Sequence, residues 1–129
     1  MNRLLVIEDQ PSDLRIATDV AQSLGISEIE ARTSSRAGQI YLQAALDAQA
    51  PLPDSIVLDL DLGYESGYEL LRFWHSNPKL SPIRMIIWTV LGEEQREICR
   101  LFKVHAVVSK WEGSAALKSA LESKADTVC

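Results

Sequence analysis

Short apolar runs alternate along the chain with segments that repeat apolar residues at the 3.6-residue period of an amphipathic helix. This alternation is typical of strand–helix units that build a parallel sheet. The apolar runs bounded by charged residues or by Gly, Pro, Asn and Ser predict five strands, at residues 3–7, 29–32, 55–58, 83–88 and 105–108.

The helical segments between these runs carry recognisable start and stop signals. Pro11 suits the first turn of a helix that Gly25 ends, and Ser34 or Ser35 can cap the second helix. Further helices are predicted at 67–75, at 93–102 and near the end of the chain. The apolar positions that mark four of the five helices are Leu14, Ala17, Ala21 and Leu24; Ala37, Ile40, Tyr41 and Ala44; Ile98, Leu101 and Phe102; and Leu117, Ala120 and Leu121. Right-handed crossovers then predict a three-layer α/β sandwich.

Length and charge narrow the classes of protein that this chain can represent. Its 129 residues suffice for one domain, and a net charge of −5 without basic runs argues against direct nucleic-acid binding. No apolar stretch is long enough to cross a bilayer, and the N-terminus lacks the order of a signal peptide. Cys99 and Cys129 show no metal-ligand spacing, so we expect reduced thiols, a cytoplasmic location and no membrane partner.

Residues that can handle a phosphoryl group or a hard metal follow four of the predicted strands. Glu8 and Asp9 follow the first strand, Asp59 the third, Thr89 the fourth and Lys110 the fifth. In a parallel α/β sheet these strand ends meet at one edge. A carboxylate such as Asp59 can attack phosphorus, and Mg²⁺ would offset the repulsion among the three acids. Thr89 and Lys110 could then donate hydrogen bonds to phosphoryl oxygens.

Each of these residues also has an ordinary structural interpretation. Asp9 and Thr89 could cap the helices that follow them, Asp59 could be a turn residue, and Lys110 a solvated charge. It is the recurrence at four strand ends that favours a shared site.

In this order and spacing, the strand-end residues resemble the receiver domain of two-component response regulators over essentially the whole chain. The resemblance implies one domain over residues 1–129, with a flavodoxin-like, doubly wound sheet of order 2-1-3-4-5 and five helices. It implies that Asp59 is the phosphoacceptor, with Thr89 and Lys110 assisting. Asp9 would bind Mg²⁺ directly and Glu8 mostly through water. Asp59 and the backbone carbonyl of Asp61 would complete the protein ligands, and Gly67 also matches the family.

The resemblance further implies a signalling switch rather than an enzyme in the usual sense. A histidine kinase or histidine phosphotransfer protein would supply the phosphoryl group. A protein target would contact the face made by helix 93–102, strand 105–108 and the last helix, and pairing of two copies is left open. Arg96, Arg100 and Lys103 lie at helical spacing there, although a solvated face paired with Glu93 and Glu97 explains them equally.

Four positions depart from the family pattern. Gly63 replaces a common proline, Ser66 replaces a common aspartate, Trp111 replaces a cis-proline, and Val107 replaces an aromatic that often moves on activation. Gly63, Trp111 and Val107 support an alternative in which the chain is a docking module that does not switch.

A second alternative is a haloacid-dehalogenase-type phosphatase, because Asp59-Leu60-Asp61 resembles the first motif of those enzymes. In that family the nucleophile lies on the first strand, and the metal-binding acids follow the lysine. Here the acids come first, and Glu112 and Glu122 belong to a predicted helix, so the order of motifs disfavours this alternative.

Overall fold

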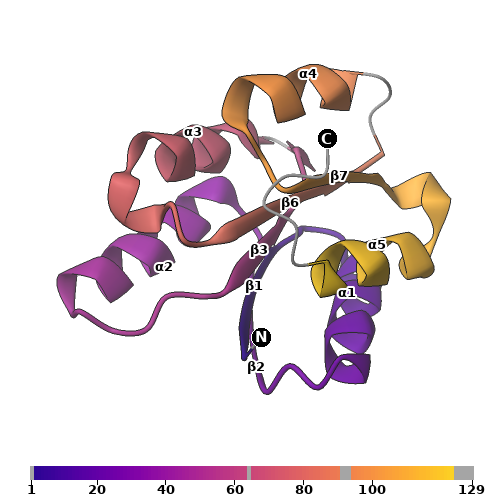
Figure 1. Cartoon of the computed structure of the whole chain (residues 1–129), viewed down its shortest axis with the longest axis horizontal. Helices are drawn as coiled ribbons and strands as arrows, with labels where there is room; N and C mark the ends of the chain where they lie inside the picture. The colour runs from indigo at the N-terminus through magenta and orange to yellow at the C-terminus, as the bar shows by residue number, and fades with distance from the viewer. Residues whose placement is uncertain (1, 64, 91–93, 124–129) are drawn as a thin grey trace.

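The computed structural model of the chain describes residues 2–63, 65–90 and 94–123, without the side chains of residues 94–96 and 99 (Figure 1). Glu93, Cys129 and the side chains of Arg96 and Cys99 therefore lie outside the described residues. The strands are β1 (Arg3–Ile7), β2 (Glu28–Arg32), β3 (Ser55–Leu58), β4 (Asp61–Leu62), β5 (Glu65–Ser66), β6 (Arg84–Thr89) and β7 (Ala106–Ser109). The helices are α1 (Pro11–Ser23), α2 (Ser35–Asp47), α3 (Tyr68–Ser76), α4 (Glu94–Phe102) and α5 (Ser114–Glu122), with 3₁₀ turns η1 (Pro78–Leu80) and η2 (Lys110–Glu112).

Five strands form one parallel sheet in the order β2-β1-β3-β6-β7. This confirms the predicted flavodoxin-like order, since β6 and β7 are the fourth and fifth strands of the sheet along the chain. Each strand lies within one residue of its predicted range. The central strands are continuous apolar runs because helices cover both of their faces.

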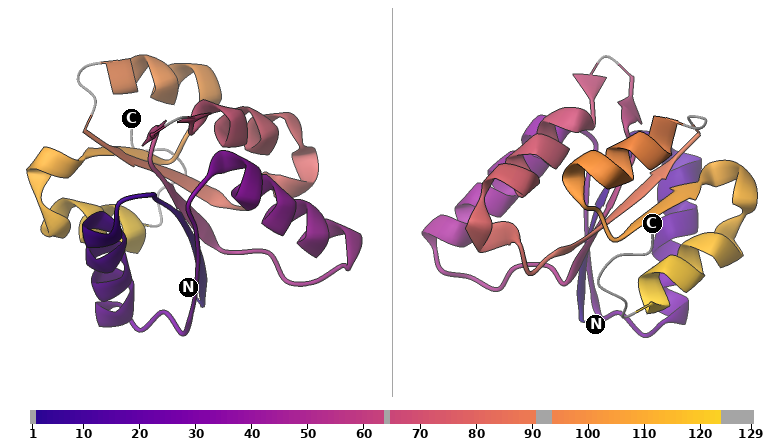
Figure 2. Two further views of the ribbon diagram at one scale, coloured as in Figure 1. Left: turned by 180° about the vertical axis from the view of Figure 1, so that it is seen from behind. Right: turned by 45° about the horizontal axis from the view of Figure 1, so that its top comes forward.

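Helices α1 and α5 cover one face of the sheet, and α2, α3 and α4 cover the other (Figures 1 and 2). Alternate residues of each central strand enter opposite cores. On β1, Leu4 and Val6 pack toward α1 and α5, whereas Leu5 and Ile7 pack toward α2 and α3. The three-layer sandwich predicted from the sequence is therefore confirmed.

Two predicted helical stripes are buried only in part. Helix α2 forms with Ser34 as its cap, whose side chain accepts a hydrogen bond from Ala37 N, but it buries Ser35, Gly38, Leu42 and Ala45. Ile40, part of the predicted stripe, is 61% exposed. On α4, Ile98 is buried as expected, whereas Leu101 is 69% exposed. In α2, small residues allow the helix to approach the sheet closely, and a count of large apolar residues does not detect them.

The segment after β3 forms a two-stranded antiparallel hairpin, β4–β5, where the sequence predicted only a turn. Gly63 lies in its bend with a φ of 72°. The Ser35 hydroxyl donates to Ser66 O at 2.7 Å, and the Glu65 carboxylate accepts a hydrogen bond from Ser35 N. These contacts attach the hairpin to the start of α2.

Candidate functional site

The acidic residues lie at the edge of the sheet because they directly follow β1 and β3. These strands pair in parallel with Ile7 opposite Leu58. The pattern continues past their ends, since Asp59 N donates to Ile7 O at 3.1 Å and Glu8 N donates to Arg32 O at 3.0 Å. The backbone therefore fixes both acids where the parallel strands end.

Glu8, Asp9 and Asp59 form a cluster that suits a divalent cation. Each offers a carboxylate oxygen, and these three oxygens lie within 4.8 Å of one another. Glu8 and Asp59 are buried, and Asp9 Oδ1 is buried without a hydrogen-bond partner among the residues that the structure describes. Buried charged oxygens need compensation, and a hard cation with oxygen ligands supplies it. The residues present thus fit a Mg²⁺-type site.

Lys110 lies at the same edge, with its side chain 8% exposed. Its Nζ donates to Glu8 Oε2 at 2.6 Å, to Asp13 Oδ2 at 2.8 Å and to Asp59 Oδ2 at 3.0 Å. Burial alone would lower the pKa of Lys110, but hydrogen bonds to the three carboxylates outweigh it and raise that pKa above its ordinary value. The interpretation of Lys110 as a solvated charge is therefore wrong.

Glu8 is the most perturbed acid of the site. Burial raises its pKa to about 7, while hydrogen bonds from Lys110 and from Gln10 N act in the opposite direction. The nearby Asp59 charge raises the pKa further. Such shifts from burial and like charge are frequent where a site concentrates acids for chemistry.

Asp59 is held on both of its carboxylate oxygens. Its Oδ1 accepts from Asp61 N at 3.1 Å, so it does also serve as a turn residue, and its Oδ2 accepts from Lys110. The backbone of Gly67 crosses directly over Asp59: a Cβ on Gly67 would collide with the Asp59 carbonyl oxygen and lie 2.9 Å from Leu60 Cα. Glycine at this position therefore lets the start of α3 pack on the backbone of Asp59 and Leu60.

The alternative roles of Asp9 and Thr89 as helix caps find no support. Helix α1 has Gln10 at its cap position, without a side-chain cap hydrogen bond. Thr89, at the end of β6, is fully buried, and its Oγ1 has no hydrogen-bond partner among the described residues. The side chain of Asp61 is exposed, and the role of its carbonyl as a metal ligand stays a prediction.

The departures from the family pattern have structural consequences. The φ of 72° at Gly63 is one that a proline ring excludes, so the hairpin requires the change. The Lys110–Trp111 peptide is trans, as are the other peptide bonds of the described residues. Ser109 Oγ accepts from Trp111 N at 3.2 Å to start η2, and Trp111 is 82% exposed. Ser66 Oγ accepts from Tyr68 N at 3.0 Å, and the residue at the cap position of α3 is Gly67.

Sequence reasoning missed Asp13, the third acid on Lys110. It lies in the first turn of α1, four residues after Asp9. Because Cα–Cβ bonds tilt toward the N-terminus of a helix, an acid in a first turn that starts beside a strand end points back to that edge. An acid one turn after the strand-end pair, in a helix started by Pro11, was therefore a usable signal.

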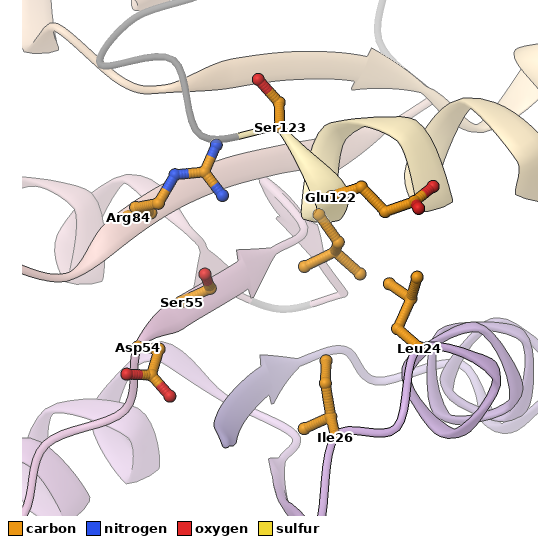
Figure 3. Close-up of a pocket in the computed structure, with 8 residues that line it drawn as sticks. Leu24, Ile26, Asp54, Ser55, Arg84, Glu122 and Ser123 are labelled. Atoms are coloured by element: carbon orange, nitrogen blue, oxygen red, sulfur yellow. The ribbon is translucent and has the colours of Figure 1, made fainter. Parts of the chain in front are cut away.

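A separate pocket of about 410 Å³ lies at the opposite edge of the sheet, where β3 and β6 begin (Figure 3). Leu24, Ile26 and Leu121 form its apolar wall, and Arg84 donates weakly to Ala120 O at 3.4 Å. Asp54, which also lines it, accepts hydrogen bonds from Asn2 N and Arg3 N. None of the strand-end acids lines this pocket, so it is distinct from the candidate site.

Comparison with known proteins shows which proteins share the fold of this chain. No family model matches the sequence. Response regulator Rcp1 of Synechocystis sp. is 27% identical over 104 residues, which cover 79% of this chain and 70% of that protein. A Mn²⁺-bound structure of Rcp1 superposes with a TM-score of 0.77 at 23% identity, covering 95% of this chain and 90% of that one.

Two further solved structures show the same architecture. The phosphorylated cyanobacterial phytochrome response regulator RcpA gives a TM-score of 0.77 at 23% identity, with coverage of 94% and 89%. A two-component response regulator of Cytophaga hutchinsonii gives 0.79 at 21% identity, with 94% of both chains covered. The fold is that of response regulator receiver domains, and the resemblance predicted from the strand ends is confirmed. The cluster of Glu8, Asp9 and Asp59 is typical of the receiver phosphorylation site.

Among the described residues, no helix combines the length and apolar character that crossing a bilayer requires.

Proposed function

We propose that this chain is a receiver in a two-component phosphorelay, in which Asp59 accepts a phosphoryl group from a phosphohistidine. The observation that carries the proposal is the contact of Lys110 Nζ with Asp59 Oδ2, at 3.0 Å, beside the cluster of three acids. A carboxylate nucleophile, a fixed cation and a metal-type cluster are the parts that phosphoryl transfer needs.

In this mechanism an oxygen of Asp59 attacks phosphorus while the P–N bond to the donor imidazole breaks and its electron pair remains on nitrogen. Lys110 stabilises the charge on the phosphoryl oxygens. Thr89, whose hydroxyl has no hydrogen-bond partner in the described part of the chain, donates it to one of them. Glu8, Asp9, Asp59 and the Asp61 carbonyl would hold Mg²⁺, which supplies charge neutralisation when bound.

The output surface belongs to the same proposal. We place it on α4, β7 and α5, where a target protein would bind. A histidine kinase or histidine phosphotransfer protein would be the other partner, as the donor of the phosphoryl group. Three large apolar side chains near this face are exposed: Leu101 at 69%, Trp111 at 82% and Val90 at 41%. Exposed apolar residues of this kind suit protein contacts. Arg100 pairs with Glu97 at 3.4 Å, and Lys103 follows the end of α4.

Residues 1–129 would form one receiver domain, acting in the cytoplasm without a membrane or nucleic-acid partner.

The alternative is a docking module that does not switch. The hairpin bend at Gly63, the exposed Trp111 and the aliphatic Val107 favour it, because they alter the surroundings of the site. The complete set of site residues favours the phosphorylated switch.

Intact mass after incubation with acetyl phosphate and Mg²⁺ tests the proposal. The wild-type protein should gain one phosphoryl group, and Asp59→Asn should gain none. Chelation of the metal by EDTA should abolish the gain. If Asp59→Asn is phosphorylated as well as the wild type, Asp59 is not the acceptor. If the wild type gains nothing from acetyl phosphate or from a phosphohistidine donor, the docking module is the better description.

A further inference from the structure

The ammonium of Lys110 is shared among three carboxylates that do not all belong to the cation cluster. Glu8 and Asp59 supply oxygens to that cluster, whereas Asp13 is not part of it. The Lys110 side chain carries three N–H donors, and Glu8, Asp13 and Asp59 accept one each. The described structure therefore shows a lysine held between the cluster and one acid beside it.

A bound cation would compete with Lys110 for the same oxygens. Glu8 Oε1 already accepts from Gln10 N, and Asp59 Oδ1 accepts from Asp61 N. The oxygens that contact Lys110 are the other oxygen of each carboxylate. A divalent ion and an ammonium drawn to Glu8 and Asp59 together would repel each other. Lys110 needs another anion if these two acids are to turn to the cation.

We infer that Asp13 is a positioning residue that retains Lys110 while Glu8 and Asp59 bind the cation and the phosphoryl group. This inference rests on the proposed function. Asp13 lies 2.8 Å from Nζ, and its side chain is 27% exposed, against 1% for Glu8 and 5% for Asp59. Asp13 is thus the partner with room to follow Lys110, whereas the two cluster acids are enclosed.

The composition of the site supports the same assignment. Glu8, Asp9, Asp13 and Asp59 bring four carboxyl groups to it, and Lys110 is the cation that contacts three of them. After transfer, the esterified oxygen of Asp59 no longer carries charge, and the phosphoryl oxygens become acceptors for Lys110. Asp13 then keeps one N–H donor of Lys110 occupied and leaves the other two for oxygens of the phosphoryl group.

The first test is Mn²⁺ affinity, measured from the free-ion signal in electron paramagnetic resonance, which requires no phosphorylation. Asp13→Asn should weaken Mn²⁺ binding about tenfold, the size expected for losing one hydrogen bond between charged groups. Asp19→Asn is the matched control, because it removes the same charge from an exposed position on the same helix. It should change the affinity less than twofold.

A double-mutant cycle with Lys110→Met separates positioning from simple loss of charge. If Asp13 acts through Lys110, Asp13→Asn should lower Mn²⁺ affinity much less in the Lys110→Met background than in the wild type. An equal loss in both backgrounds would overturn the inference. Should Lys110→Met fail to fold, as judged by circular dichroism, Asp13→Glu decides: it must recover most of the affinity lost in Asp13→Asn.

The two proposals fail in distinguishable ways. A wild type that binds Mn²⁺ and is phosphorylated, together with an Asp13→Asn variant that matches Asp19→Asn, overturns the role of Asp13 alone. A wild type that binds no Mn²⁺ and gains no phosphoryl group overturns the proposed function itself.

Discussion

At the scale of single residues, the candidate site contains buried ionisable groups that are stable only while they contact their partners. Glu8 and Asp59 are almost completely enclosed, and Lys110 supplies their shared cation. Removing one partner of such a buried group is far more costly than its net contribution suggests, because the remaining charge stays buried. The site therefore depends on all of its members.

Glu8 makes the stability of the metal-free protein depend on pH. Its pKa is about 7 in the folded chain, against an ordinary 4.5, because burial disfavours its charged form. The folded state therefore binds the proton more tightly, and the free energy of unfolding should fall as pH rises from about 4.5 to 7, by about 3 kcal/mol. Urea unfolding in EDTA, repeated at several pH values between about 4.5 and 7, measures this change in the free energy of unfolding.

Glu8→Gln is the control for this prediction, because glutamine keeps the shape and does not titrate. Its unfolding free energy should stay nearly flat over the same range. A slope equal to that of the wild type would assign the pH dependence to other groups.

The convergence of the strand-end acids could be predicted from the sequence, whereas the role of Asp13 was missed. Glu8, Asp9 and Asp59 directly follow apolar runs, and the parallel sheet determines where they meet. The position of Asp13 depends on how the first turn of α1 is rotated, and a pattern of apolar residues predicts that rotation poorly.

At the scale of elements, strands were easier to predict than the details around them. The buried apolar runs of β1, β3 and β6 are long enough to be recognised as strands in the sequence. Hairpin β4–β5 has two residues in each strand, too few to show a period. Helix α2 buries Ser35 and Gly38 beside Leu42 and Ala45, so its buried face does not coincide with the apolar stripe predicted from the sequence.

Two glycines at the starts of helices give a matched comparison of packing. A Cβ at Gly67 meets the backbone of Asp59 and Leu60, which cannot move without displacing the site. A Cβ at Gly38 meets mainly Ile7 Cδ1, at 2.8 Å, which is the end of a flexible side chain. Gly67→Ala should therefore destabilise the fold by about 2–3 kcal/mol, and Gly38→Ala by no more than about 1 kcal/mol, since alanine also favours the helix.

Urea unfolding of the two variants checks this difference, and phosphorylation by acetyl phosphate provides a second measurement. Gly67→Ala should also slow the gain of the phosphoryl group, because Asp59 moves. Equal stability losses for both variants would show that the backbone crossing at Gly67 is not a constraint.

At the scale of the whole molecule, we expect the acid cluster to make the stability of the protein depend on divalent cations. A ligand that binds only the folded state at 100 times its Kd adds about 2.7 kcal/mol to the unfolding free energy. That gain corresponds to several degrees of Tm in a domain of this size. Saturating Mg²⁺ should therefore raise the Tm of the wild type measurably.

Asp9→Asn should be more stable than the wild type without a divalent cation and less stable than the wild type with one. In EDTA the variant should be more stable than the wild type, by roughly 1 kcal/mol, because one of three crowded negative charges is gone. In saturating Mg²⁺ it should be less stable than the wild type, because Asp9 is a proposed ligand. Thermal unfolding by circular dichroism in both buffers tests this, and a Mg²⁺ response equal to that of the wild type would remove Asp9 from the metal site.

The ring of Trp88 lies in the buried layer beside the candidate site, 5.0 Å from Lys110 Nζ. A cation at that distance from an indole perturbs its excited state. The fluorescence of Trp88 should therefore change when Lys110 Nζ moves. Trp74 is enclosed elsewhere in the core, donating to Ile83 O, and Trp111 faces solvent. With these two replaced by phenylalanine, Trp88 would be the single tryptophan of the chain, beside its proposed acceptor. Candidate kinases could then be screened in real time without radioactive label.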